Sequence, residues 1–128
     1  MERKIISIAA LMGITAIILG AFGAHALKNF LSMDQLSSFE TGIKYQMYHT
    51  LFLLFLGTTT LINEKTKKTI LLLVVFGVFF FSGSIYLLTT KAITAIDFSL
   101  LGIVTPIGGA LIIVAWGVLF WNIWKSKR

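Results

Sequence analysis

Residues 70–90 read ILLLVVFGVFFFSGSIYLLTT, a run of 21 residues without a charged side chain. A helix needs about 20 apolar residues to cross a hydrocarbon layer about 30 Å thick, so this run is long enough to span a membrane. Within lipid, every backbone polar group must be bonded internally, which a lone helix achieves and a lone strand does not. The apolar–polar alternation that marks a membrane β-barrel is also absent. This stretch therefore predicts a transmembrane helix.

Three further apolar runs occupy residues 5–27, 43–62 and 100–124. They contain 23, 20 and 25 residues, so each meets the same length requirement. Together with residues 70–90 they predict an all-α protein, an integral membrane bundle of four transmembrane helices. No internal repeat or linker divides the chain, so we expect a single transmembrane domain over residues 1–128.

The composition indicates that lipid is the solvent. The chain is 57 % hydrophobic and 12 % charged, about half the roughly 25 % charge of a soluble domain. Its formal charge is +6, but the basic residues lie between and beyond the apolar runs, so no nucleic-acid partner is expected. The chain has no cysteine, which excludes disulfides, thiolate catalysis and cysteine-ligated metals.

The basic residues predict which side of the membrane each end occupies. With four spans, both termini and the second connection share one side, which holds eight lysines and arginines, whereas the other side holds three. Such an excess marks the cytoplasmic side, so we expect both termini in the cytoplasm. The eight are Arg3, Lys4, Lys65, Lys67, Lys68, Lys125, Lys127 and Arg128, and the three are Lys28, Lys44 and Lys91.

Residues 28–42 show a different pattern. Apolar residues recur at helical spacing opposite acidic residues and serine, and Ser32 precedes them as a candidate helix cap. This pattern predicts a short amphipathic helix in the outer interface, either separate from the second span or continuous with it. The apolar positions are Met33, Leu36, Phe39 and Ile43, and the polar positions are Asp34, Ser37 and Glu40.

Polar side chains gather at one level of the predicted bundle, towards its outer side, whereas the inner halves of the spans are almost purely apolar. Polar groups inside a membrane are costly and normally face a partner or a cavity. The cluster therefore either fixes helix register through hydrogen bonds or forms a binding site. Its members are His25, Tyr45, Gln46, Tyr48, His49, Ser82, Ser84, Tyr86, Thr105 and Pro106.

His49 can join two helices, because a neutral imidazole has one donor and one acceptor. We expect it to hydrogen-bond across helices, with Tyr86, Ser82 or His25 as candidate partners. His25 and His49 also raise the alternative of a bis-histidine haem or metal site. Two histidines without a carboxylate or cysteine near His49 are weak support for such a site, so no cofactor, metal or catalytic residue is assigned.

Small residues recur at three- and four-residue spacing along the first span, at Gly13, Ala16, Gly20 and Gly23. Such a stripe lets a second backbone approach closely. It predicts a helix-packing face, which could serve a neighbour within the bundle or a second copy of the chain.

Pro106 interrupts the fourth span, with two alternatives for its role. A helix that begins near residue 100 would be kinked there, whereas a helix capped by Thr105 would take Pro106 as its first residue. Interrupted helices near polar groups are where transporters bind substrate. Proton-coupled carriers usually embed an acidic residue, however, and no carboxylate lies inside any of the four spans.

Four short segments, one in each span, read GAFGAHAL at residues 20–27, YQMYHTL at 45–51, FSGSIYL at 81–87 and TPIGGA at 105–110. Together they resemble the YgdD/YwdK family of small uncharacterised bacterial membrane proteins. The resemblance implies a four-helix protein of the plasma membrane. It brings no activity, cofactor or catalytic residue.

The sequence thus predicts a multi-pass protein of the bacterial plasma membrane with a structural or accessory role. Glycine-rich phosphate loops, serine elbows and HExxH motifs are absent from the sequence, so we expect no enzymatic activity. Candidate partners beyond the lipid bilayer are a second copy, giving a homo-oligomer, and a larger membrane complex. One alternative is a carrier or channel-like protein that binds a small polar molecule or lipid head group at the broken fourth helix, and another is a haem or metal protein.

Overall fold

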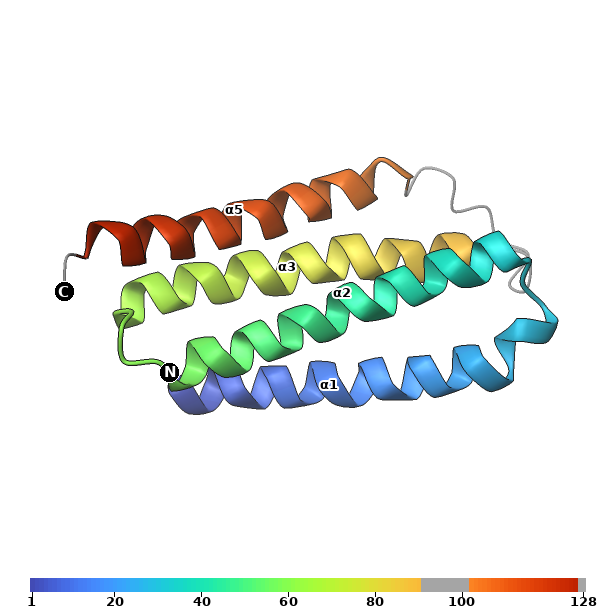
Figure 1. Cartoon of the computed structure of the whole chain (residues 1–128), viewed down its shortest axis with the longest axis horizontal. Helices are drawn as coiled ribbons and strands as arrows, with labels where there is room; N and C mark the ends of the chain where they lie inside the picture. The colour runs from blue at the N-terminus through green and yellow to red at the C-terminus, as the bar shows by residue number, and fades with distance from the viewer. Residues whose placement is uncertain (91–101, 127–128) are drawn as a thin grey trace.

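The computed structural model describes residues 1–90 and 102–126, which form four long α-helices and one short 3₁₀ helix. The helices are α1 (Glu2–His25), η1 (Leu27–Asn29), α2 (Met33–Thr58), α3 (Glu64–Thr89) and α5 (Val104–Lys125). Each α-helix runs antiparallel to the one before it (Figure 1). Both chain ends therefore lie at one end of the bundle, the terminal end, together with the α2–α3 connection. The α1–α2 connection lies at the opposite, distal end.

The expectation of an all-α, four-helix protein is confirmed. Three of the helices, α1, α3 and α5, are long and apolar enough to cross a membrane. The second helix is of comparable length but more polar, and it packs between α1 and α3. Residues 100–101, at the predicted start of the fourth span, lie outside the described residues.

The predicted short interfacial helix is not a separate element of the structure. Residues 33–42 form the first turns of α2, which begins ten residues before the predicted second span. A capping box starts this helix: the Ser32 amide donates to Gln35 Oε1 over 2.9 Å, and the Gln35 amide donates to Ser32 Oγ over 3.1 Å. Phe39 is only 1 % exposed and packs against Tyr86 of α3, so these turns pack against the bundle.

Two apolar cores lie along the bundle. The larger joins all four helices in its terminal half and includes Ile5, Leu53, Ile70 and Ile112. The smaller, at the distal end, consists of Leu27, Leu31 and Phe39. Between Phe39 and Phe52 of α2 lie the buried polar residues Gln46 and His49, so polar groups separate the two cores.

Two glycines bring α3 and α5 into close contact. A Cβ atom on Gly108 would lie 2.3 Å from the backbone nitrogen of Phe81 and 2.7 Å from the carbonyl oxygen of Gly77. These neighbours are backbone atoms, so a side chain at Gly108 could be fitted only by moving the helices apart. Small residues at such crossings are the usual way for membrane helices to pack.

Neither alternative for Pro106 matches the structure. The helix α5 begins at Val104, so Pro106 is its third residue, and the cap position is Ile103, without a side-chain capping bond. The first four amide hydrogens of a helix have no acceptor within the helix, so proline costs no backbone bond there. The helix α5 is therefore unbroken from Val104 to Lys125.

Candidate functional site

Gln46 of α2 is the junction of the polar groups between the two cores. Its Nε2 donates to the Met12 carbonyl over 2.8 Å and to Thr15 Oγ1 over 2.7 Å, both on α1. Its Oε1 accepts a hydrogen bond of 2.7 Å from the Tyr86 hydroxyl on α3. One buried amide thus joins three helices and uses both of its N–H donors.

His49, one turn further along α2, connects this helix to α5. Its Nδ1 lies 2.7 Å from the Tyr45 carbonyl oxygen, which can only accept, so Nδ1 carries the proton. Its Nε2 then accepts a hydrogen bond of 2.9 Å from the indole nitrogen of Trp116. The Trp116 ring also packs on Phe52, with centroids 4.2 Å apart. A hydrogen bond across helices was predicted for His49, but its partner is Trp116 instead of Tyr86, Ser82 or His25.

Three hydroxyl groups make further polar contacts between helices. Ser82 Oγ donates to the Gly42 carbonyl over 2.7 Å, where a Cβ atom on Gly42 would lie 2.8 Å from the Tyr86 ring. Ser84 and Thr105 share a hydrogen bond between α3 and α5. We call the bonded set between the two cores the polar layer, whose outer members Thr15 and Trp116 are exposed. It consists of Thr15, Gln46, His49, Thr50, Ser82, Tyr86 and Trp116.

The polar layer is closed. Within residues 1–90 and 102–126, every buried side-chain nitrogen and oxygen atom has a hydrogen-bond partner. The same residues contain no group of three or more side chains that could hold a metal ion. Both nitrogens of His49 are occupied by protein partners, so neither offers a lone pair to a cofactor in this arrangement.

The structure does not bring the whole predicted cluster together. His25 is exposed at the end of α1, and Tyr45, Tyr48 and Pro106 also point outward. Gly23 of α1 packs on Phe39, which lies ten residues before His49, and His25 lies two residues beyond Gly23. The two histidines are therefore about 18 Å apart along the bundle. Two facing axial ligands of one haem are therefore not assembled.

Trp116 is the residue that the sequence reasoning missed. It was counted among the apolar residues of the fourth span, yet it lies near the middle of α5, far from the interfaces where tryptophan is common. The Trp116 residue is 47 % exposed, but an indole N–H within a hydrocarbon layer still needs an acceptor. A mid-helix tryptophan among aliphatic residues was thus the available signal.

The small residues of α1 face α2. A Cβ atom on Gly13 would lie 3.4 Å from Thr50 Cγ2, and one on Gly23 would lie 3.0 Å from the Phe39 ring. Gly20 lies opposite Ile43, and Ala16 is 1 % exposed. This stripe therefore packs within the bundle in the described structure.

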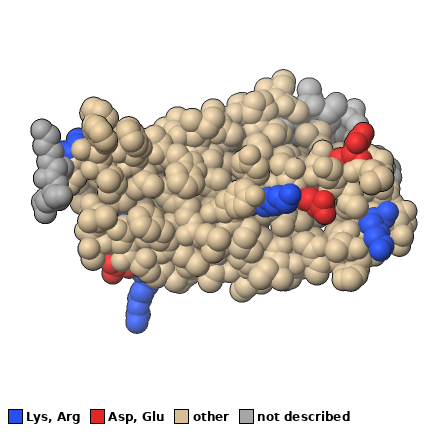
Figure 2. Space-filling view, viewed as in Figure 1, with Lys and Arg blue, Asp and Glu red and all other residues tan. Residues whose placement is uncertain are grey.

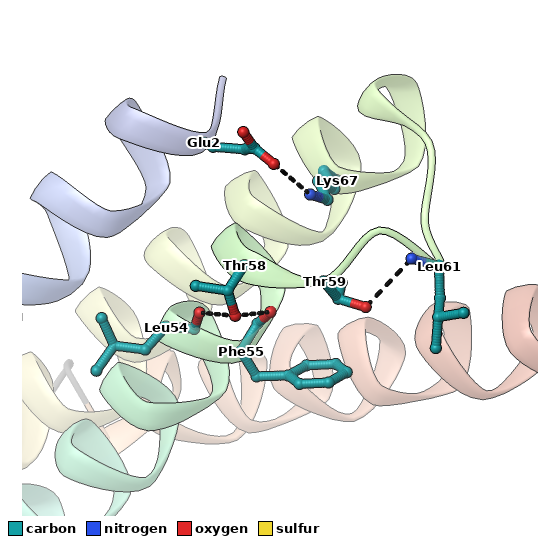
Figure 3. A network of polar contacts seen from close by, with 7 residues as sticks. All are labelled: Glu2, Leu54, Phe55, Thr58, Thr59, Leu61 and Lys67. Carbon is teal, nitrogen blue, oxygen red and sulfur yellow. Dashed lines mark hydrogen bonds and ion pairs between the residues drawn. The ribbon is translucent and has the colours of Figure 1, made fainter.

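An ion pair ties the start of α1 to α3 at the terminal end. Lys67 Nζ lies 3.8 Å from Glu2 Oε2, and Lys67 is only 3 % exposed (Figure 3). Beside this pair, the Thr58 hydroxyl bonds to the carbonyls of the preceding turn of α2. The face shown in Figure 2 is largely uncharged: charged side chains lie near its two ends, and one basic and one acidic side chain lie next to each other nearer its middle.

These features define a class, the small multi-pass helical membrane protein with an internally bonded polar layer. Residues 19–109 match the family described as "Protein of unknown function (DUF423)". The UPF0382 membrane protein of Haemophilus influenzae is 35 % identical over 127 residues, covering 99 % of this chain and 98 % of the relative. The chain therefore belongs to the UPF0382/DUF423 family of membrane proteins, and the resemblance predicted from the four segments is confirmed.

Two further relatives carry names of their own. The UPF0382 membrane protein YwdK of Bacillus subtilis is 35 % identical, with 89 % of this chain and 90 % of the relative covered. The UPF0382 inner membrane protein YgdD of Escherichia coli is 30 % identical, with 99 % and 94 % covered. No solved structure matches the chain.

Proposed function

We propose that this protein is a structural or accessory component of the bacterial plasma membrane without enzymatic activity, and that its polar layer serves to hold the helices in register. The observation that carries this proposal is Gln46, whose amide bonds to α1 and α3 at the same time. An amide on one helix that bonds to two neighbouring helices is suited to fixing the positions of all three. Both of its N–H donors are bonded within the protein, so neither is left for a substrate.

The closed polar layer also supports the absence of catalysis. General acid–base chemistry needs a titratable group within reach of a substrate proton. His49, the titratable candidate of the layer, has both nitrogens bonded inside the protein and is 3 % exposed. The carrier alternative depended on a break in the fourth helix, and α5 is continuous over the described residues that include Pro106.

The proposed topology places all four helices across the membrane, with both termini in the cytoplasm. Six described basic residues lie at the terminal end, compared with Lys28 and Lys44 in the distal half, which fits a cytoplasmic terminal end. The name of the Escherichia coli relative, an inner membrane protein, supports the plasma membrane as the location. The first turns of α2, with Asp34 and Glu40 exposed, would then lie in the outer interface.

A rigid bundle of this kind fits a role as a partner of other membrane proteins, either a second copy or a larger complex. The test is blue native electrophoresis of membranes solubilised in a mild detergent, with chemical crosslinking of intact cells beforehand. We expect the tagged protein in one defined assembly above the monomer mass, and crosslinks that disappear with a deletion of the partner gene. Migration as a monomer with no crosslinked species would contradict an accessory role.

A deletion strain separates the structural role of the polar layer from a binding role. Gln46→Leu is expected to restore growth only in proportion to the amount of protein left in the membrane. A Gln46→Leu protein present at the wild-type amount that fails to restore growth would show that Gln46 contacts a ligand.

A further inference from the structure

A groove between α1 and α2 lies near the distal end, outside the polar layer. Its volume is about 270 Å³, and its floor is formed by Gly20, Gly23, Ala24 and the ring of Phe39. Gly20 leaves space open on α1, because a Cβ atom there would meet only Ile43, at 3.9 Å, whereas the Phe39 ring already packs on Gly23. The floor is therefore backbone and apolar surface, which suits the first methylene groups of an acyl chain.

Two opposite charges line the same groove. Glu40 and Lys44 lie four residues apart on α2, so their side chains lie on one face of the helix, one turn apart. Both are exposed, and neither makes an ion pair or a hydrogen bond with another described residue. The groove thus joins an apolar floor to one free carboxylate and one free ammonium group.

The depth of the groove matches the boundary between hydrocarbon and head groups. Gly20 and Gly23 lie in the last two turns of α1, which ends at His25. An apolar stretch of about 20 residues fills the hydrocarbon layer, so these turns reach its outer edge. Charged side chains at this depth are favoured when a charged group of the lipid meets them.

We propose that this groove binds a phospholipid whose head group carries both a phosphate and a primary ammonium, as phosphatidylethanolamine does. Lys44 contacts the phosphate, and Glu40 accepts hydrogen bonds from the ammonium, each a charge-assisted contact. A purely anionic head group leaves Glu40 facing negative charge. A trimethylammonium head group has no N–H to donate to Glu40.

Native mass spectrometry of the full-length protein in detergent tests this assignment, with dioleoyl phosphatidylethanolamine, phosphatidylcholine and phosphatidylglycerol added one at a time at equal concentration. We expect phosphatidylethanolamine adducts to exceed the other two about fivefold, the size of one partly exposed ionic contact. Equal adducts of the three lipids, or a preference for phosphatidylglycerol, would overturn the proposal.

Matched variants show whether the groove is responsible. Glu40→Gln should remove the preference for phosphatidylethanolamine over phosphatidylcholine, and Lys44→Gln should lower the adducts of all three lipids. The controls Asp34→Asn and Lys28→Gln remove the same charges from the distal end outside the groove and should keep the wild-type preference. A preference retained in both groove variants would contradict the site. If the wild type showed no lipid preference and formed a dimer that both groove variants lost, the proposal would be wrong. The groove would then bind a second copy of the chain.

Discussion

Trp116 of α5 donates its indole hydrogen to Nε2 of His49 in α2 over 2.9 Å, which joins two helices that are not neighbours in the chain order. The main packing partner of α5 is α3, so this bond ties the last helix to a second one. The other ring nitrogen of His49 is held by the Tyr45 carbonyl, which fixes the tautomer that can accept from Trp116. The imidazole is therefore neutral, and both of its nitrogens are hydrogen-bonded within the protein.

A double-mutant cycle measures this bond. Trp116→Phe and His49→Phe should each lower the free energy of unfolding in detergent, and their effects should be less than additive by about 0.6 kcal/mol, up to about 1.7. His49→Gln should cost less than His49→Phe, because it keeps a donor and an acceptor. The control is Trp121→Phe, the same change at an outward-facing indole that is 60 % exposed. Additive effects of Trp116→Phe and His49→Phe would show that the bond does not stabilise the fold.

The contact between Gly77 and Gly108 predicts a strong effect for one methyl group. Gly108→Ala places a Cβ atom 2.3 Å from the Phe81 backbone nitrogen, so α3 and α5 must separate, at a cost of about 1–3 kcal/mol or more. Gly117→Ala is the matched control on the same helix, because its Cβ atom would meet nothing within 4 Å. Thermal unfolding in detergent should show a lower midpoint temperature for Gly108→Ala and an unchanged midpoint temperature for Gly117→Ala. Equal midpoints would mean that the helices are not in close contact.

Cysteine labelling tests the proposed topology without background, because the chain has no cysteine. Single cysteines are introduced at Ser37, at the distal end, and at Thr66 and Ser126, at the terminal end. With an impermeant reagent outside intact cells, only Ser37→Cys should react, and all three should react after permeabilisation. Labelling of Thr66→Cys in intact cells would contradict a cytoplasmic terminal end.

The helices and several members of the polar layer could be predicted from the sequence. Apolar runs of 20 residues or more have few structural alternatives in lipid, so four helices could be predicted. Gln46, His49, Ser82 and Tyr86 were all in the predicted cluster because polar side chains inside a span need partners. The hydrogen-bond partners of these side chains could not be predicted from the sequence, because they depend on how the helices are aligned. That alignment is set by the close helix contacts at Gly42, Gly77 and Gly108.

The errors have a shared cause. Hydropathy treats each position separately, so Trp116 was counted as apolar although its N–H needs an acceptor. Residues 33–42 were predicted to form an amphipathic helix, either separate from the second span or continuous with it, and they form the first turns of the continuous helix α2, with Phe39 and Gly42 buried in the bundle. His25 was grouped with His49 because the second helix was expected to begin at residue 43, and its start at Met33 shifts His49 towards the middle of the helix.

The central claim, that the polar layer is structural, is tested most directly by the free energy of unfolding of Gln46→Leu, measured by denaturant titration in detergent micelles. Leucine removes the bonds to Met12, Thr15 and Tyr86 and leaves the Tyr86 hydroxyl without its acceptor. The control is Tyr48→Phe, which removes a hydroxyl from a side chain that is 54 % exposed. A structural polar layer predicts that Gln46→Leu lowers the free energy of unfolding by about 1–2 kcal/mol and that Tyr48→Phe leaves it unchanged. Wild-type stability of Gln46→Leu would contradict it.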